Sequence, residues 1–261
     1  MIVDCHTHKP GSIADEAGAS EHLQATGTVD VSIVLAEAKG KNEEVNKQLS
    51  EYVGKYKEKF IGFAVVDPVN DKIGAKSISA IPEKLGLKGA VFYCAGCGFH
   101  PTHSRAMRFY DTAQEVGLPV FFHNEDALLD EAVLSYAQPF LLDEVARTFP
   151  ELKIVIGTMG VPFVDQTLAV IGKHKNVYAD LTIQPNKVWQ VYNMVVSAHE
   201  NGVMDKMLFG SGFPYGNAGE CIETLLGFNK LLADTNLPTV RRGDIRNIIE
   251  RNTLELLGVE R

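Results

Sequence analysis

Short apolar segments alternate along this chain with longer segments in which apolar and polar residues recur at helical spacing. The apolar segments "IVLA", "IGFAVV", "LPVFFH" and "LKIVIG" are nearly continuous, which is typical of parallel strands buried on both faces. We predict eight strands, at Ile2–Cys5, Val29–Leu35, Phe60–Val66, Lys88–Tyr93, Pro119–His123, Lys153–Ile156, Val177–Leu181 and Met207–Phe209.

The longer segments between and after these strands have the pattern of amphipathic helices. In Ser104–Val116 the residues Met107, Tyr110, Ala113 and Val116 recur every three positions, which predicts one buried stripe. The first connection, Ala14–Thr26, is short and weakly patterned. We predict the other helices at Glu43–Tyr56, Ile73–Leu85, Phe140–Phe149, Val164–Lys173, Pro185–Asn201, Glu220–Leu232 and Arg242–Leu257.

Eight strands that alternate with helices predict the α/β class, as a single (β/α)8 TIM-type barrel with a C-terminal helix. The length of 261 residues suits one barrel, since such barrels run to about 250 residues. We find no linker or internal repeat and expect one domain over residues 1–261. An open doubly wound sheet is the alternative, but that fold usually has fewer strands, and no Gly-x-Gly-x-x-Gly follows the first strand.

Composition narrows the class of partner. The chain is 45% hydrophobic and 22% charged, with a net charge of −8, so we expect neither nucleic acid nor an anionic membrane as a partner. The substrate is then a small molecule. The N-terminal sequence lacks the pattern of a secretory signal, and no segment is long and apolar enough to span a membrane. Four cysteines do not make a disulfide framework in a chain of this length, so we expect a cytoplasmic protein.

Two histidines follow the first strand at a spacing of two residues. His6 and His8 can share one face of an extended strand and point together into the barrel mouth, where active sites of such barrels lie. Paired imidazoles suit zinc or a similar metal, although a lone His-x-His is also common as two ordinary loop residues.

A third histidine, His123, ends the apolar run of the fifth strand. A buried histidine that only packs is the simpler explanation, but this one falls at the same barrel end as the first pair. Three histidines from two strands would give the ligand number of catalytic zinc, which leaves one position open.

The ordered fragments of the chain resemble the amidohydrolase-related family, the branch that contains small-acid hydrolases, lactonases and metal-dependent decarboxylases. The resemblance covers nearly the whole chain. It is carried by "DCHTH", "FIGFAVVDP", "LKGAVF", "VGLPVFFH", "FPELKIVIGTMGVP", "NVYADL", "LFGSGFPYG" and "IIERNTLELLG". Members often self-associate, so the resemblance also implies a homo-oligomer.

The resemblance implies that His6, His8 and His123 hold a divalent metal, zinc or manganese. Two further family positions differ in this chain. Thr158 stands where the family has a strand-six histidine that orients water or substrate, and Gly212 stands where it has a strand-eight aspartate that binds the metal and acts as a base. Threonine does not titrate near neutral pH, and glycine has no side chain, so neither can supply proton transfer.

Three explanations of these two differences stay open. A different carboxylate could serve, namely Glu37, Glu125, Asp126 or Asp180, although each is more simply a solvated charge or a partner of a ligand. The chemistry could instead need no such group, for instance where a substrate carboxylate is itself a metal ligand. Finally, the barrel could have lost catalysis and kept the binding of an anionic ligand or a protein partner.

A second group of chemically active residues lies in the loop after the fourth strand, Cys94, Cys97, His100 and His103. Four such side chains within ten residues suggest structural zinc or a redox pair. The two residues between the cysteine pair and the histidine pair leave little room for tetrahedral convergence, so an ordinary loop with a polar helix cap is the favoured interpretation.

The remaining histidines, His22, His174 and His199, lie in or beside predicted helices and are expected at the surface. For Trp189 we expect core packing or an oligomer contact rather than substrate stacking. The sequence as a whole predicts a metal-dependent hydrolase, decarboxylase or lactonase for a small, carboxylated organic molecule, with the inactive barrel as the alternative.

Overall fold

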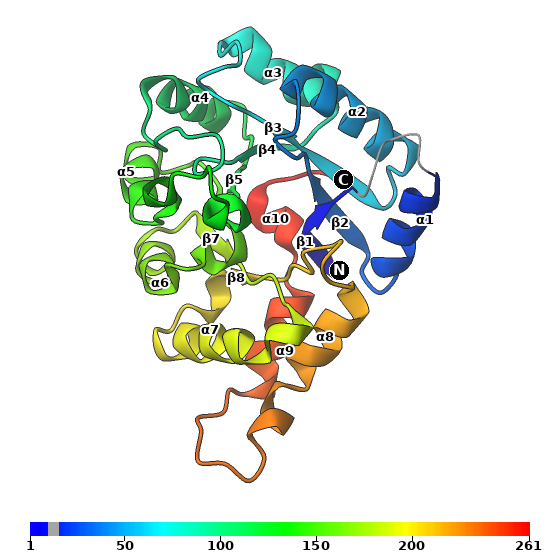
Figure 1. Ribbon diagram of the computed structural model, residues 1–261, viewed down its shortest axis with the longest axis vertical. Helices are drawn as coiled ribbons and strands as arrows, with labels where there is room; N and C mark the ends of the chain where they lie inside the picture. The colour runs from blue at the N-terminus through cyan, green and yellow to red at the C-terminus, as the bar shows by residue number, and fades with distance from the viewer. Residues whose placement is uncertain (10–15) are drawn as a thin grey trace.

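The computed structural model describes residues 1–9 and 16–261, apart from the side chains of Glu125, Asp126 and Leu231. Eight parallel strands follow one another in the order β1 to β8 (Figure 1). They are β1 Val3–His8, β2 Val31–Leu35, β3 Phe60–Val65, β4 Gly89–Phe92, β5 Val120–Phe122, β6 Ile154–Ile156, β7 Val177–Asp180 and β8 Met207–Leu208.

The first and last strands meet through the residues that follow β8. The amide of Cys5 donates to the carbonyl of Phe209 at 2.9 Å, and the amide of Gly212 donates to the carbonyl of His6 at 2.9 Å. The amide of His8 then donates to the carbonyl of Phe213 at 2.8 Å. These bonds bring the sheet round into a nearly closed barrel, so the predicted (β/α)8 fold is confirmed and the open doubly wound sheet is wrong.

Helices α1 to α7 lie outside the barrel between successive strands, and α8, α9 and α10 follow β8 (Figure 1). The α-helices are α1 Glu16–Ala25, α2 Asn42–Lys55, α3 Ala75–Lys84, α4 Ser104–Glu115, α5 Leu141–Thr148, α6 Val164–Lys173, α7 Val188–Glu200, α8 Ala218–Leu226, α9 Arg242–Glu250 and α10 Thr253–Leu257. Within the described residues, no helix is both long and apolar enough to cross a membrane.

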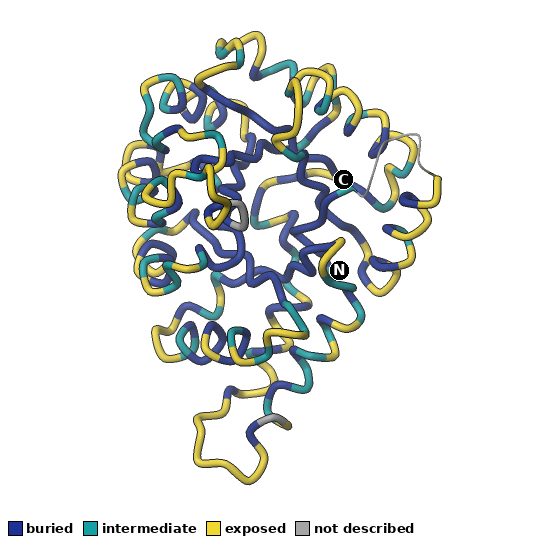
Figure 2. The backbone as a smooth tube through the Cα atoms, in the orientation of Figure 1, coloured by how far each residue is buried: buried dark blue, intermediate teal, exposed yellow. Residues whose placement is uncertain are grey.

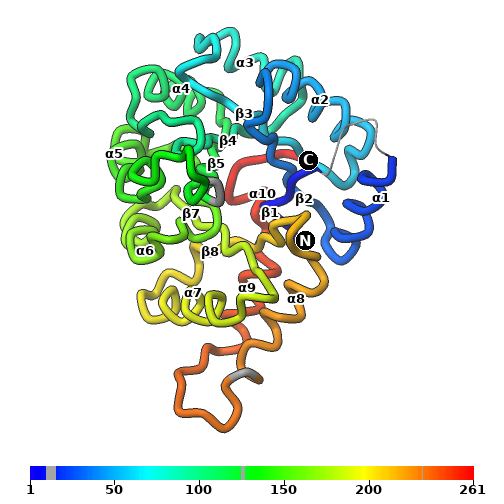
Figure 3. The backbone as a smooth tube through the Cα atoms, in the orientation of Figure 1, coloured from blue at the N-terminus to red at the C-terminus, as the bar shows by residue number. Residues whose placement is uncertain are grey.

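Several predicted boundaries differ from the structure. Strand β1 continues to His8, so both candidate ligands lie within the strand and not after it. The predicted last helix is two helices, because Arg251 takes an extended conformation between α9 and α10. The predicted helix Glu220–Leu232 is α8 followed by a 3-10 turn at Phe228–Leu232, and the chain from there to α9 extends away from the barrel (Figure 3).

The eight strands form the buried centre of the protein, since every one of their residues is buried (Figure 2). The buried face of α4 consists of Ala106, Phe109, Tyr110 and Ala113, which recur at the helical spacing of three and four residues. The predicted stripe was therefore only partly right, because Met107 is half-buried and Val116 is exposed beyond the end of the helix.

The expectation that His22 lies at the surface is wrong. Its ring is fully buried between Phe60, at 4.3 Å between ring centroids, and Phe213, at 4.6 Å, and its Nδ1 lies 3.0 Å from the Tyr52 hydroxyl. Polar neighbours in the sequence suggested exposure, but the helical face that carries His22 turns toward the barrel. The other two histidines are half-buried, and His174 pairs with Asp143 at 2.7 Å.

Burial and the nearby charges of Lys59 and Lys9 lower the pKa of His22 to about 3. An unfolded chain binds this proton near pH 6.5, so stability falls as the pH drops from about 6.5 toward 3. The full shift corresponds to roughly 5 kcal/mol at about 1.4 kcal/mol per pKa unit. We therefore expect His22→Phe, which keeps the ring stack, to lose less of its free energy of unfolding than the parent does between pH 7 and pH 4.

Urea denaturation at several pH values measures this difference, with His199→Phe as the control for changing a histidine. The comparison with the parent is needed because Asp4 has the opposite effect. Burial raises the pKa of Asp4 to about 6, which adds stability as the pH falls through that value. Parallel pH dependences of the parent and His22→Phe would contradict the assignment.

Candidate metal site at the barrel mouth

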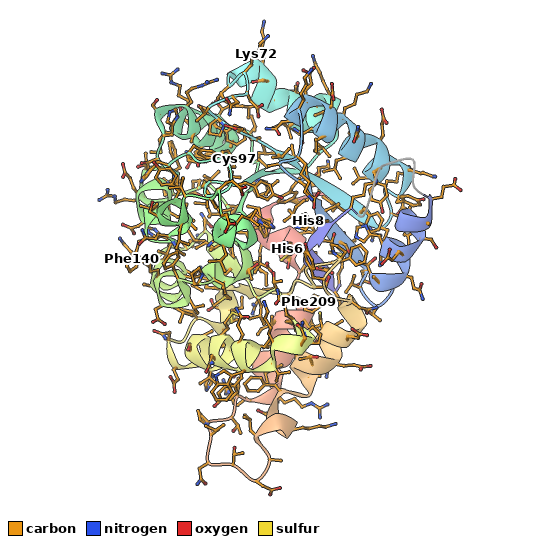
Figure 4. All side chains as sticks on the ribbon, in the orientation of Figure 1. His6, His8, Lys72, Cys97, Phe140 and Phe209 are labelled. Atoms are coloured by element: carbon orange, nitrogen blue, oxygen red, sulfur yellow. The ribbon has the colours of Figure 1, made fainter. Side chains whose placement is uncertain are left out.

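Three imidazoles from two strands converge inside the barrel. His6 and His8 are alternate residues of β1, and His123 directly follows β5. The Nε2 atom of His8 lies 3.2 Å from that of His6 and 3.2 Å from that of His123. The three side chains are the one group among the described residues whose nitrogen, sulfur or carboxylate atoms converge in a way that could hold a metal ion (Figure 4 labels His6 and His8).

The hydrogen bond at the back of His8 fixes its tautomer. Nδ1 lies 3.2 Å from the carbonyl of Leu35, which can only accept, so Nδ1 carries the proton and Nε2 presents a lone pair. Burial lowers the pKa of His8 well below its usual value, and His123 and His6 lower it further. His8 is therefore neutral at physiological pH, which is the protonation state that a metal ligand needs.

His6 has a stronger partner in the carboxylate of Asp180. Nδ1 of His6 lies 2.6 Å from Oδ2 of Asp180 and 2.9 Å from the Thr182 hydroxyl. A carboxylate accepts the Nδ1 proton, so Nε2 of His6 also points a lone pair toward the centre of the three rings. Both rings of β1 are thus oriented from behind by acceptors.

The arrangement fits a divalent metal. Two imidazole lone pairs that face each other at 3.2 Å repel unless a cation lies between them. For a tetrahedral zinc ion with Zn–N bonds of about 2.0–2.1 Å, two ligand nitrogens would be separated by roughly 3.3–3.4 Å. The observed spacing is close to that value.

Asp180 is held by several donors at once. The amide of Thr158 donates to Oδ2 at 3.1 Å, the amide of Thr182 donates to Oδ1 at 2.9 Å, and the hydroxyl of Thr182 donates to Oδ2. Burial raises the pKa of Asp180, but the attraction of His6 and these hydrogen bonds outweigh it and hold the pKa below its usual value. Asp180 is therefore ionised although it is fully buried.

The two positions that differ from the family pattern lie beside this site. Thr158 is in a 3-10 turn after β6 with φ of +49°, a conformation that is rare for a β-branched residue, and its hydroxyl donates to Thr182 at 3.3 Å. Gly212 has φ of +64° and bonds through its amide to His6. Their places in the structure match the places that the sequence motifs assign to them.

Of the substitutes whose side chains the structure describes, Glu37 and Asp180, it is Asp180 that lies next to the three histidines. It contacts His6 on the side of the ring away from Nε2, so it is a partner of a ligand and not a ligand itself. Glu37 is half-buried and pairs with Lys39 at 2.9 Å. The side chains of Glu125 and Asp126 lie outside the described residues.

A second buried carboxylate was not anticipated. Asp4 accepts from the hydroxyl of Ser211 at 2.7 Å and from its amide at 2.9 Å, which ties β1 to the segment after β8. The alternation Asp4, His6, His8 along β1 was the available signal, since residues two apart share a face. Thr182 had no such signal, because it lies beyond the end of β7 and has φ of +37°.

The loop with Cys94 and Cys97 does not form a structural metal site. None of the four cysteines forms a disulfide, and Cys94, Cys97, His100 and His103 do not converge on a common point among the described residues. His103 instead caps α4, where its Nδ1 accepts from the amide of Arg105 at 3.3 Å, and Nδ1 of His100 accepts from the amide of Thr102 at 3.1 Å. The polar helix cap of the favoured interpretation is therefore present at His103, while His100 bonds within the loop.

Trp189 does not pack in the core, because 64% of its surface is exposed. It stacks on Tyr192 at the start of α7, with ring centroids 5.2 Å apart. Of the two expectations for this residue, core packing is wrong and an oligomer contact stays a prediction.

The fold and the site together define a (β/α)8 barrel with a buried cluster of three histidines at the carboxyl ends of its strands. A family model described as amidohydrolase matches residues 3–259, so the chain belongs to the amidohydrolase family. No curated protein sequence matches the chain significantly.

Solved structures with the same fold are distant in sequence. An uncharacterized TIM-barrel protein from Bordetella bronchiseptica has a TM-score of 0.69 at 16% identity, with 98% of each chain covered. A probable 2-pyrone-4,6-dicarboxylic acid hydrolase from Acinetobacter baumannii, with citric acid bound, has a TM-score of 0.67 at 14% identity, covering 98% of this chain and 99% of that chain. A 5-carboxyvanillate decarboxylase from Novosphingobium aromaticivorans, complexed with manganese and 4-hydroxy-3-methoxy-5-nitrobenzoic acid, has a TM-score of 0.68 at 13% identity, covering 99% and 96%.

Gly210 gives a test of how tightly the site is built. A Cβ atom at this position would lie well inside van der Waals contact with Oδ1 of Asp180 and 3.0 Å from Cβ of His6. We expect Gly210→Ala to lower the free energy of unfolding by about 1–3 kcal/mol, as overpacking of a filled interior does.

Gly54→Ala is the matched control, since a Cβ there meets nothing within 4 Å and the residue is itself exposed near the end of α2. This control is expected to be neutral or slightly stabilising. Thermal and urea denaturation of the two variants measure the contrast. Equal stabilities would mean that Asp180 has room to move.

Proposed function

We propose that this barrel binds one divalent metal ion, zinc or manganese, through His6, His8 and His123, and that it acts as a hydrolase or carboxy-lyase on a small carboxylated organic molecule. The observation that carries the proposal is the convergence of three Nε2 atoms, with neighbouring separations of 3.2 Å, in a buried site. A metal in this place would polarise a substrate oxygen as a Lewis acid or activate water.

The residues around the three histidines orient the imidazole rings and exclude water from the site. The carbonyl of Leu35 and the carboxylate of Asp180 hold the two β1 imidazoles with their lone pairs inward. The exposed fraction of the three histidine side chains is 6% or less, so a charge in the site is poorly screened by solvent. Thr158 offers a hydroxyl beside the site that can orient a substrate oxygen but cannot exchange a proton near neutral pH.

Charge favours an anionic substrate. Three imidazole ligands carry no negative charge and would leave a bound divalent metal with its full charge of +2, because Gly212 supplies no carboxylate where the family pattern has aspartate. A substrate carboxylate would neutralise part of that charge. The bound molecules named for the similar structures, citric acid and a hydroxybenzoic acid, are carboxylic acids of this general kind.

The alternative function is an inactive barrel that binds an anionic ligand or a protein partner. The observation that favours it is the absence of a titratable side chain at Thr158 and Gly212, the positions that carry proton transfer in the family pattern. The same histidine site would serve both functions, so metal binding alone does not separate them.

The first test is the metal content of the purified, untagged protein. We expect about one equivalent of zinc or manganese in the parent and less than a tenth of that in His6→Ala and His8→Ala, because each variant removes one ligand. His199→Ala, which changes a half-buried histidine on α7, is the control and should bind as the parent does. Elemental analysis after growth with added zinc or manganese measures the ratio, and equal metal in parent and His6→Ala would refute the site.

A restored family site tests whether catalysis survives in the barrel. We expect the double variant Thr158→His, Gly212→Asp to show higher lactonase, esterase or decarboxylase turnover than the parent, because it supplies a base and a fourth ligand. Aspartate is one of the residues that tolerates positive φ best, which makes Gly212 a favourable position for it.

The measurement is a screen of lactones, esters and aromatic acids with the metal-loaded parent and double variant. Turnover by the parent alone would support chemistry that needs neither group. No turnover by either protein, with metal bound to both, would favour the inactive barrel.

A further inference from the structure

Burial of the Asp180 carboxylate lowers the stability of the fold unless other contacts compensate for it. A fully buried carboxylate loses its hydration, and the chain compensates with donors from two segments, the amides of Thr158 and Thr182 and the Thr182 hydroxyl. Two further features make room for it. Thr158 takes a left-handed conformation that turns its amide toward Asp180, and residue 210 is glycine, where any side chain would collide with Oδ1.

Two of these donors bind the same carboxylate oxygen that contacts His6, a proposed metal ligand. The oxygen Oδ2 receives the amide of Thr158 and the hydroxyl of Thr182, and the same oxygen lies 2.6 Å from Nδ1 of His6. His8 has only a backbone carbonyl at the corresponding position. The two proposed ligands on β1 therefore differ, and His6 is the one with a side-chain carboxylate as its partner.

Asp180 places a negative charge behind His6, whereas Gly212 has no side chain that could supply one. Strands β6, β7 and β8 lie consecutively and β8 is followed by the segment that bonds to β1, so Asp180 of β7 is close enough to act on His6 from behind. A carboxylate behind an imidazole makes that imidazole a more basic ligand and holds its orientation, without occupying a position on the metal.

We propose that Asp180 is the positioning residue of the metal site and that it compensates, through His6, for the carboxylate ligand missing at Gly212. This proposal rests on the proposed function, since it presupposes that His6 binds the metal. It assigns the hydroxyl of Thr182 and the amide of Thr158 to holding Asp180, and it leaves the coordination position near Gly212 for an anionic substrate.

The test compares two buried carboxylates. Metal is stripped with a chelator, and the affinity for Zn²⁺ alone is measured by competition with a chromophoric chelator in the parent, Asp180→Asn, Asp4→Asn and His6→Ala. We expect Asp180→Asn to bind Zn²⁺ about 10- to 100-fold more weakly than the parent, which is the usual effect of changing such a partner. Asp4→Asn is the matched control, because Asp4 is equally buried but bonds to Ser211 and to the His6 backbone, and it should stay within about threefold.

A spectroscopic measurement separates positioning from general damage. In protein labelled with ¹⁵N-histidine, the Nδ1 proton of His6 should resonate far downfield because it is shared with a carboxylate at 2.6 Å. This signal should be present in Asp4→Asn and shifted upfield in Asp180→Asn. If Asp180→Asn does not fold, Thr182→Val, which removes one donor to Asp180 at nearly constant volume, should weaken Zn²⁺ binding several-fold.

The outcomes distinguish the two proposals. Loss of Zn²⁺ binding in His6→Ala together with parent affinity in folded Asp180→Asn would overturn the role of Asp180 and leave the metal site intact. Parent affinity in His6→Ala would overturn the metal site itself. Equal weakening in Asp180→Asn and Asp4→Asn would also overturn the positioning role, since the effect would then follow from any lost buried charge.

Discussion

The contact between the carboxylate of Asp180 and the imidazole of His6 is the interaction on which the mouth of this barrel depends. It joins β7 to β1, and it requires a left-handed residue after β6 and a glycine after β8. Strands β6, β7 and β8 are consecutive and β8 is followed by the segment that bonds to β1, so one buried carboxylate contacts four neighbouring parts of the barrel. A buried carboxylate without such donors would lose more free energy than the surrounding packing supplies, which is why the left-handed conformation of Thr158 persists.

The barrel could be predicted because its signal is distributed over the whole chain. A nearly continuous apolar run such as "IGFAVV" needs both faces of its strand to be covered, and this run contains a strand that is buried along its length. The boundaries were harder to predict where buried polar residues belong to a strand. The predicted first strand stopped at Cys5, whereas β1 continues through His6 and His8. The barrel buries these polar side chains at its mouth, although their hydropathy is typical of a loop.

The convergence of His6, His8 and His123 could be predicted from local properties of the sequence. Residues two apart on a strand share a face, and parallel strands end on the same side of a barrel. The network behind these histidines could not be predicted, because it depends on contacts over 174 residues, between His6 and Asp180, and over 207 residues, between Asp4 and Ser211. The error on His22 has the same origin. Polar neighbours in the sequence indicate exposure, while its actual neighbours, Phe60 and Phe213, come from β3 and from the segment after β8.

The position of the negative charge has a consequence for the chemistry of the site. A carboxylate that binds a metal directly lowers its net charge and competes with an anionic substrate for the same cation. A carboxylate placed behind an imidazole strengthens that ligand but does not compete with the substrate for the metal. Its charge is partly neutralised by the Nδ1 proton of His6 and by the donors around it. The cost is that Asp180, surrounded by donors and ionised, is not placed to take a proton from water in the mouth. A site built in this way suits reactions in which the substrate brings its own carboxylate to the metal, and it is poorly suited to hydrolysis that needs a base at the position of Gly212.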